Sequence, residues 1–131
     1  MTFQELRSCI AADQFRYDGG SGARDFWRQW FRERGFRFTV VMRLCAFFRS
    51  QPWSRWGIYH LFRCWHRRQQ VKYGTYVSFE SEIGAGLYLG HLVCIVVNTQ
   101  TVIGRNCTLG HEVTLGQTNA QFRPMTVCVF T

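Results

Sequence analysis

Residues 102–116 read VIGRNCTLGHEVTLG, a stretch in which an aliphatic residue followed by glycine recurs at every sixth position. The pairs are Ile103-Gly104, Leu109-Gly110 and Leu115-Gly116. This period fits neither an α-helix, whose period is about 3.6, nor a single strand, whose side chains alternate. It is typical of a solenoid of short strands, in which the aliphatic side chain points inward and a small residue follows where the backbone turns. The stretch therefore predicts a coil of stacked short strands.

The same rhythm extends back to residue 77. Its apolar positions are six residues apart except for one interval of eight, and they are Val77, Ile83, Leu89, Val97, Ile103, Leu109 and Leu115. Glycine follows five of these seven residues, which is far more often than its share of the chain would give. A solenoid buries such a ladder of side chains only by stacking one coil on the next. An ordinary β-meander with coincidental glycines is the alternative.

The 131-residue chain changes composition near residues 70–75. Residues 1–74 carry 14 basic and five acidic side chains, a net of +9, whereas residues 75–131 carry two and three, a net of −1. We therefore divide the chain into an arginine-rich helical region (1–74), a region of strand repeats (75–119) and a tail (120–131). With 47% hydrophobic residues, the chain has too much apolar surface to be mainly disordered.

Helical spacing of apolar residues marks the first region. Thr2 followed by Glu5 fits a capping box that opens a helix through about Ala12. Three further helical faces are predicted at 26–31, 40–48 and 58–65. We expect Gly35 to cap the end of the second helix and Ser54 to cap the start of the last.

Ten arginines are scattered over these helices: Arg24, Arg28, Arg32, Arg37, Arg43, Arg49, Arg55, Arg63, Arg67 and Arg68. The first interpretation is a solvated polar face on amphipathic helices. A second is peripheral membrane contact, because Arg with Trp and Phe on an amphipathic helix is the composition of an interfacial anchor. Nucleic-acid binding is the weakest, since no zinc finger, RRM signature or helix-turn-helix accompanies the charge. We expect no nucleic-acid partner and keep membrane contact as an alternative.

The six cysteines have no C-x-x-C pair and no short Cys/His spacing that suits zinc: Cys9, Cys45, Cys64, Cys94, Cys107 and Cys128. We expect reduced, mostly buried thiols and no metal site. No window reaches the roughly 18 apolar residues that span a bilayer. The N-terminus also lacks the pattern of a signal peptide. These features predict a cytoplasmic location.

The repeat segments IGAGLYLGH (83–91), IVVN (95–98), VIGRNCTLG (102–110) and VTLG (113–116) resemble the hexapeptide-repeat acyltransferases. Within that superfamily they resemble serine O-acetyltransferases and their relatives in surface-polysaccharide biosynthesis. The resemblance covers about residues 74–117. It implies an α+β fold in which a helical region precedes a left-handed parallel β-helix with three hexapeptides per coil. It also implies a homo-trimer with active sites between subunits, acetyl-CoA as co-substrate, and L-serine or a sugar as the hydroxyl acceptor.

His91 is the candidate catalytic residue. It lies in the eight-residue interval, where the rhythm slips and the side chain falls outside the inward ladder. Transfer of an acetyl group to a hydroxyl needs a base, and histidine suits this task because its pKa lies near neutrality. His91 also matches the family's catalytic histidine; a hydrogen-bonded turn histidine is the alternative. We expect His111 to serve packing or trimer contact, and His60 and His66 to lie on the surface.

The chain departs from the family pattern around this histidine. Serine acetyltransferases carry an aspartate some fifteen residues before it, where this sequence has Tyr76. Glu80 or Glu82 is the candidate substitute, provided that the coil brings one of them to His91. Relatives also have glycine three residues after the histidine, where this sequence has Cys94. That side chain either narrows the acceptor pocket or packs into the coil.

The rhythm stops after Asn119, whereas relatives continue for several more coils. We therefore expect a truncated or frameshifted product whose cofactor-binding residues are unknown. Two classes of function follow. The first is an acetyl-CoA-dependent O-acetyltransferase with weak or absent turnover. The second is an inactive remnant that serves as an assembly or membrane-surface protein.

Overall fold

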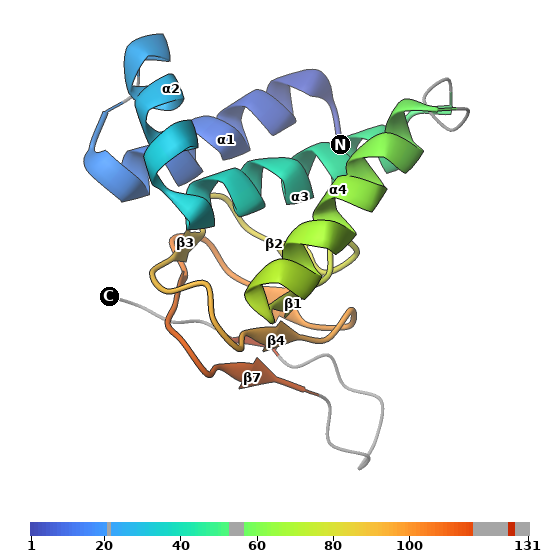
Figure 1. Ribbon diagram of the computed structural model, residues 1–131. Helices are drawn as coiled ribbons and strands as arrows, with labels where there is room; N and C mark the ends of the chain where they lie inside the picture. The colour runs from blue at the N-terminus through green and yellow to red at the C-terminus, as the bar shows by residue number, and fades with distance from the viewer. Residues whose placement is uncertain (21, 53–56, 117–125, 128–131) are drawn as a thin grey trace.

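The computed structural model of the protein describes residues 1–20, 22–52, 57–116 and 126–127. The helices of this part of the chain are α1 (Phe3–Asp18), α2 (Ala23–Arg32), α3 (Arg34–Ser50) and α4 (Ile58–Tyr73). They pack together on one side of the molecule, above the strands that follow them (Figure 1). Helix α4 ends at Gly74, which adopts the left-handed conformation (φ 59°), and the first strand begins two residues later.

Each strand in the described residues is two residues long: β1 (Tyr76–Val77), β2 (Glu82–Ile83), β3 (Tyr88–Leu89), β4 (Val96–Val97), β5 (Val102–Ile103), β6 (Thr108–Leu109), β7 (Thr114–Leu115) and β8 (Thr126–Val127). They form three parallel sheets in the orders β1-β4-β7, β2-β5-β8 and β3-β6. The chain therefore visits the three sheets in rotation and returns to the first with every third strand. The predicted helical region followed by short parallel strands is confirmed.

The ladder positions fill the space between the sheets. Val77, Leu89, Val97, Ile103 and Leu109 are buried, and Ile83 and Leu115 are half-buried at the periphery. Phe38 and Met42 of α3 belong to the same hydrophobic cluster. The helices and the strand repeats therefore share one core. The first coil of strands has no preceding coil to pack against, and it packs against helix α3 instead.

The N-terminus of α1 has the predicted capping box. The Glu5 amide donates to Thr2 Oγ1 at 3.2 Å, and the Thr2 amide donates to Glu5 Oε2 at 2.7 Å. The predicted end at Ala12 is wrong, since α1 continues to Asp18. It stops at Gly19, which adopts the left-handed conformation that side chains disfavour.

Gly35 does not cap α2, contrary to the prediction. Helix α2 ends at Arg32, and Gly35 lies buried inside α3. A Cβ atom at this position would clash with the Leu89 carbonyl oxygen and lie 2.7 Å from the Tyr17 hydroxyl. Glycine is needed here because α3 approaches β3 closely. The predicted cap Ser54 lies outside the described residues; α4 begins after Gly57, which provides no side-chain cap.

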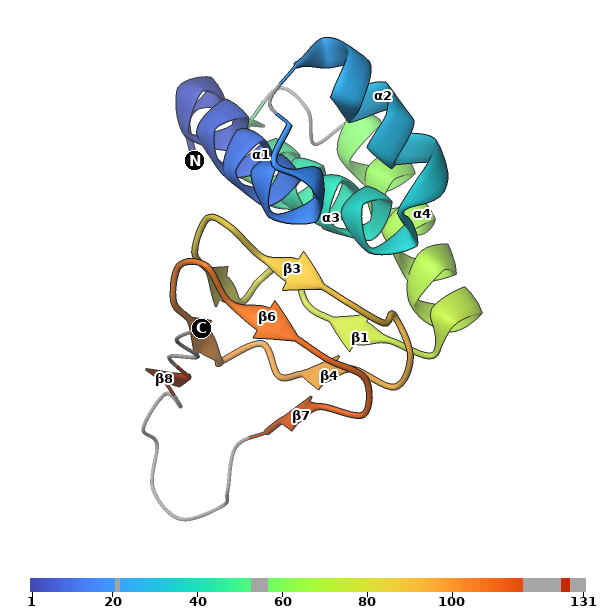
Figure 2. The same cartoon turned by 90° about the vertical axis from the view of Figure 1, so that its left-hand side faces the viewer.

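Arg43 contradicts the interpretation of the arginines as a solvated face. Its side chain is 4% exposed and pairs with Asp13, whose side chain is 0% exposed, at 3.0 Å between Nε and Oδ2. The Arg43 guanidinium also donates to the carbonyls of Ile83 and Gly84. Asp13 Oδ1 in turn accepts from the amides of Gly86 and Leu87, both at 2.8 Å. The pair therefore joins α1 and α3, which lie together above the strands in Figure 2, to the turn between β2 and β3.

The other described arginines fit the solvated face, because all are exposed except the half-buried Arg16 and Arg37. Helix α2 also leaves two aromatic side chains exposed, Trp27 at 57% and Phe31 at 73%. No helix among the described residues is long and apolar enough to cross a membrane.

The cysteines match the prediction in part. Cys9, Cys45, Cys64 and Cys94 are free thiols. Burial raises the pKa of the Cys45 thiol to about 12. Cys45 and Cys107 are buried, but Cys64 and Cys94 are exposed, so burial of most cysteines is not what the described residues show. Cys128 lies outside the described residues.

The predicted tail contributes a strand. Thr126 and Val127 form β8, which pairs in parallel register with Val102 and Ile103 of β5. The six-residue rhythm gave no indication of this strand, since it stops at Asn119. The remaining tail residues, 120–125 and 128–131, lie outside the described part of the chain.

Asp13→Asn tests the buried ion pair. Loss of one charge leaves Arg43 buried without a counter-ion, so we expect the free energy of unfolding to fall by about 3–5 kcal/mol. Asp18→Asn is the matched control, because Asp18 pairs with Arg28 at the surface and should cost at most about 1 kcal/mol. Urea unfolding measures both. Equal losses in the two variants would contradict the role given to the buried pair.

Candidate active site

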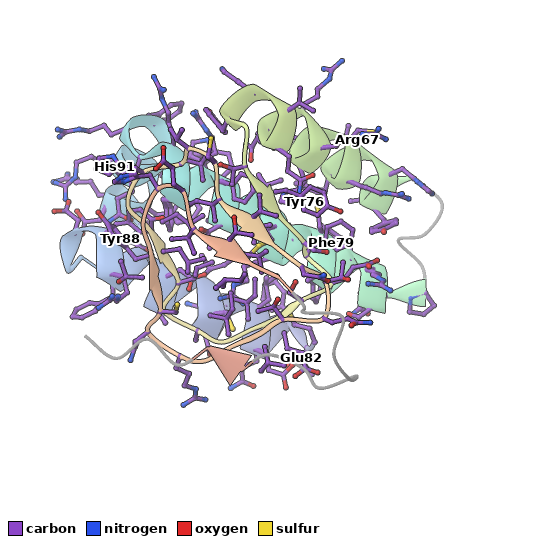
Figure 3. All side chains as sticks on the ribbon, turned by 90° about the horizontal axis from the view of Figure 1, so that it is seen from below. Arg67, Tyr76, Phe79, Glu82, Tyr88 and His91 are labelled. Atoms are coloured by element: carbon purple, nitrogen blue, oxygen red, sulfur yellow. The ribbon has the colours of Figure 1, made fainter. Side chains whose placement is uncertain are left out.

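His91 lies in the corner that joins β3 to β4. Its side chain is exposed and outside the ladder, as the slip in the rhythm predicts. The corner is held by backbone hydrogen bonds on both sides of the histidine. The Gly90 amide donates to the Leu109 carbonyl at 3.2 Å, and the Val93 amide donates to the His91 carbonyl at 2.9 Å. The imidazole is therefore presented to solvent by a fixed backbone (Figure 3).

His111 lies directly beside His91. The two ring centroids are 5.9 Å apart with an interplanar angle of 66°, and both side chains are exposed. The reason is the coil repeat: Leu89 pairs with Leu109, so the residues two positions further on are also stacked. The sequence predicts a packing or trimer role for His111. The signal that could have placed it in the site is its distance of twenty residues from His91, which equals the separation of the paired strands β3 and β6.

Neither candidate glutamate supports His91. The Glu80 carboxylate pairs with Arg49, at 2.9 Å between Oε1 and Nη1. Glu82 lies on β2, well separated from His91 in Figure 3. Tyr76, at the position of the family aspartate, has an exposed side chain on β1. The acidic residue that the fold brings to the His91 corner is Glu112, whose amide donates to the Val93 carbonyl at 3.1 Å.

Cys94 occupies a left-handed backbone position in this corner, with φ 52°. Its neighbour in the next coil, Glu112, has φ 57°. Only glycine enters this conformation without steric cost, so the cysteine at this position is strained. The Cys94 side chain is exposed, so it does not pack into the coil.

The other histidines are divided between surface and core. His60 is exposed on α4, as predicted. The prediction for His66 is wrong, because its ring is 2% exposed, packed between Phe38 and Phe79. Its Nε2 atom lies 3.0 Å from the Val77 carbonyl oxygen. Burial lowers the pKa of His66, while the hydrogen bond to Val77 acts in the opposite direction.

The chemistry available at the corner is proton transfer. Two imidazoles stand in contact with solvent, and a neutral imidazole can accept the proton of an attacking hydroxyl. Three cavities found in the described part of the chain, of about 410, 380 and 120 Å³, are lined by other residues. The His91 side chain itself is exposed in the single chain.

No protein-family model matches the sequence, and no curated protein matches it. Solved structures nevertheless share the fold. A Neisseria gonorrhoeae serine acetyltransferase in complex with serine has a TM-score of 0.71 and 21% identity, over 96% of this chain and 51% of that chain. A soybean serine acetyltransferase complexed with serine has a TM-score of 0.67 and 23% identity, over 94% of this chain and 50% of that chain.

A third structure, a serine acetyltransferase in complex with CoA, has a TM-score of 0.62 and 20% identity. It covers 86% of this chain and 46% of its own. The chain therefore has the fold of the serine acetyltransferases, helices and strand repeats together. It spans about half the length of these structures.

Cys94→Gly tests the strain at the corner. Glycine relieves the steric cost of the left-handed conformation but gives the unfolded chain more freedom, so we expect a net gain of about 0.5–1 kcal/mol in the free energy of unfolding. Cys94→Ala is the matched control, because it removes the thiol but keeps the Cβ atom and should bring no gain. Urea unfolding of both variants measures the difference. A gain shared by the alanine variant would attribute the effect to the thiol instead of the backbone.

Proposed function

We propose that this chain is an acetyl-CoA-dependent serine O-acetyltransferase in which His91 is the general base. The observation that carries the proposal is the fold shared with serine acetyltransferases over most of the chain, with two imidazoles at one exposed corner. L-Serine is proposed as the acceptor in preference to a sugar, because two of the similar structures are complexes with serine. Acetyl-CoA is proposed as the co-substrate because another is a complex with CoA.

We also propose that the strands wind as a left-handed β-helix and that the chain associates as a trimer. The rotation of successive strands through three sheets supports the coil, in which β1–β4, β2–β5 and β3–β6 are paired 20 residues apart and β4–β7 are paired 18 residues apart. The resemblance of the repeats to the hexapeptide-repeat acyltransferases supports its left hand. The exposed position of His91 supports the trimer. An exposed base cannot exclude water from a reacting thioester, and a neighbouring copy seated against the corner would enclose it.

His91 would act on the acceptor hydroxyl. Its neutral imidazole takes the hydroxyl proton while the serine oxygen attacks the thioester carbonyl carbon, and a new C–O bond forms. The imidazolium then returns this proton to the sulfur as the C–S bond breaks, which releases the free thiol of CoA and O-acetylserine. His111, in ring contact with His91, would hold the orientation of that imidazole.

Turnover is expected to be slow. A carboxylate beside a catalytic histidine orients the ring and stabilises its charged form. Glu80 is paired with Arg49, and Tyr76 offers no charge at the position of the family aspartate. Glu112 is the acidic residue of the same corner and is the proposed substitute in this chain.

The test is release of free thiol from acetyl-CoA with L-serine as acceptor. We expect slow, serine-dependent release in the unaltered chain. His91→Ala should lower the rate by about 10²–10⁴, the usual contribution of a positioned base. His60→Ala is the matched control, because this exposed histidine lies on α4 and should leave the rate unchanged.

Two outcomes would contradict the proposal. One is equal rates for the unaltered chain and the His91→Ala variant, which would exclude His91 as the base. The other is an absence of serine-dependent thiol release at any enzyme concentration, which would favour the non-enzymatic class of function.

Membrane-surface contact is a second candidate, supported by α2. Trp27 stacks on Phe31 with 6.3 Å between ring centroids, and both are exposed beside the exposed Arg24 and Arg32. Such a combination suits the interface of an anionic membrane. We expect co-sedimentation with phosphatidylserine vesicles, lost in the Trp27→Ser/Phe31→Ser double variant. Failure to co-sediment at low and high salt alike would remove this candidate.

A further inference from the structure

A cleft separates α4 from the first corner of the coil, at residues 78–81. Its volume is about 380 Å³. Arg63 and Arg67 line it from α4, and Ser78, Phe79 and Glu80 line it from the corner. The size falls at the lower end of the range of roughly 300–1,000 Å³ that is usual for small-molecule sites.

The cleft carries uncompensated positive charge. Arg63 and Arg67 are one helical turn apart, both are exposed, and neither has an ion pair or hydrogen bond among the described residues. The Glu80 carboxylate does not neutralise them, because it is engaged by Arg49 at 2.9 Å. Two guanidinium groups on one wall form the donor arrangement that best matches a carboxylate or a phosphate.

His66 lines the same cleft and has an unpartnered nitrogen. Its side chain is buried, with 2% of the residue exposed, and Nδ1 has no hydrogen-bond partner among the described residues. Its Nε2 lies 3.0 Å from the Val77 carbonyl oxygen and 3.2 Å from Gln70 Nε2, which itself donates to the Val77 carbonyl at 3.1 Å. Nδ1 is therefore without a partner in either tautomer of the ring. A buried polar atom without a partner is rare in folded proteins, and a ligand hydroxyl, which can donate or accept, would account for it.

The cleft is distinct from the candidate active site. Arg67, Tyr76 and Phe79 lie together on one side of the molecule in Figure 3, and His91 lies on the other. None of the residues that line the cleft belongs to the His91 corner. A ligand here would be neither the attacking hydroxyl nor the thioester of the proposed reaction.

We infer that this cleft binds a small organic anion that also carries a hydroxyl group. The carboxylate or phosphate of the ligand accepts hydrogen bonds from Arg63 and Arg67, and its hydroxyl group pairs with Nδ1 of His66. The inference goes beyond the proposed acetyltransfer and does not depend on it, because it uses no residue of the His91 corner.

Isothermal titration calorimetry at fixed ionic strength tests the inference with two probes, glycerate and glycerol 3-phosphate. Both carry hydroxyl donors, and they differ in the anionic group, so the tighter probe identifies that group. We expect saturable one-site binding of at least one probe. Arg67→Gln should weaken that binding by about tenfold or more, since it removes a charge-assisted contact. Arg68→Gln is the matched control, because this exposed neighbour does not line the cleft.

A second readout follows the His66 ring by NMR. Its imidazole resonances should shift as the bound probe saturates, and they should shift less with inorganic phosphate, which offers the anion without an organic hydroxyl. Two results would overturn the inference: no saturable binding of either probe, or equal weakening by Arg67→Gln and Arg68→Gln. The second result would mean that the probes respond to the general positive charge of α4. Circular dichroism of both surface variants verifies that they remain folded.

Discussion

The ion pair between Asp13 and Arg43 fixes how the helices sit on the coil. Two charges removed from water are costly unless every remaining donor and acceptor is used. Here the Asp13 carboxylate accepts two backbone amides from the turn between β2 and β3, and the Arg43 guanidinium donates to two carbonyls next to it. The turn, α1 and α3 can therefore meet in only one register. The approach of α3 to β3 at Gly35, and the core shared by Phe38 and the ladder, follow from that register.

The sequence predicts the repetitive parts of this fold well and the contacts between its parts poorly. The ladder from Val77 to Leu115 can be predicted from the sequence because each position repeats the same local geometry. The Thr2–Glu5 cap can be predicted because both partners lie within one helical turn. Arg43 looks like any other arginine of an amphipathic helix, since its partner is thirty residues away. The sequence-based prediction for His66 is wrong for the same reason. Its neighbours on α4 are exposed arginines, but its ring faces Val77 across the junction with the coil.

The candidate site is predictable from the sequence to the same extent. His91 can be identified because it lies where the six-residue spacing is interrupted. His111 can be assigned to the same site only when the number of residues in a full coil is known. The cleft beside α4 has no sequence signature, because its walls come from a helix and from a corner that are joined through Gly74. A spacing of four residues, as between Arg63 and Arg67 on α4, is common for arginines on solvated helices. Only the buried His66 ring, which lies between these two residues in the sequence and lines the same cleft, distinguishes them from the other arginines.

The corner that carries His91 absorbs a difference in chain length. Eight residues separate Leu89 from Val97, but six separate Leu109 from Leu115, yet both pairs of strands remain in register. The two extra residues lie outside the ladder and do not change the pairing of the stacked strands. Evolution can therefore lengthen, shorten or rewrite this corner without disturbing the core. In such a fold the ladder residues that form the scaffold and the corner residues that carry the chemistry can change independently. The scaffold can therefore persist while the residues of the site are replaced.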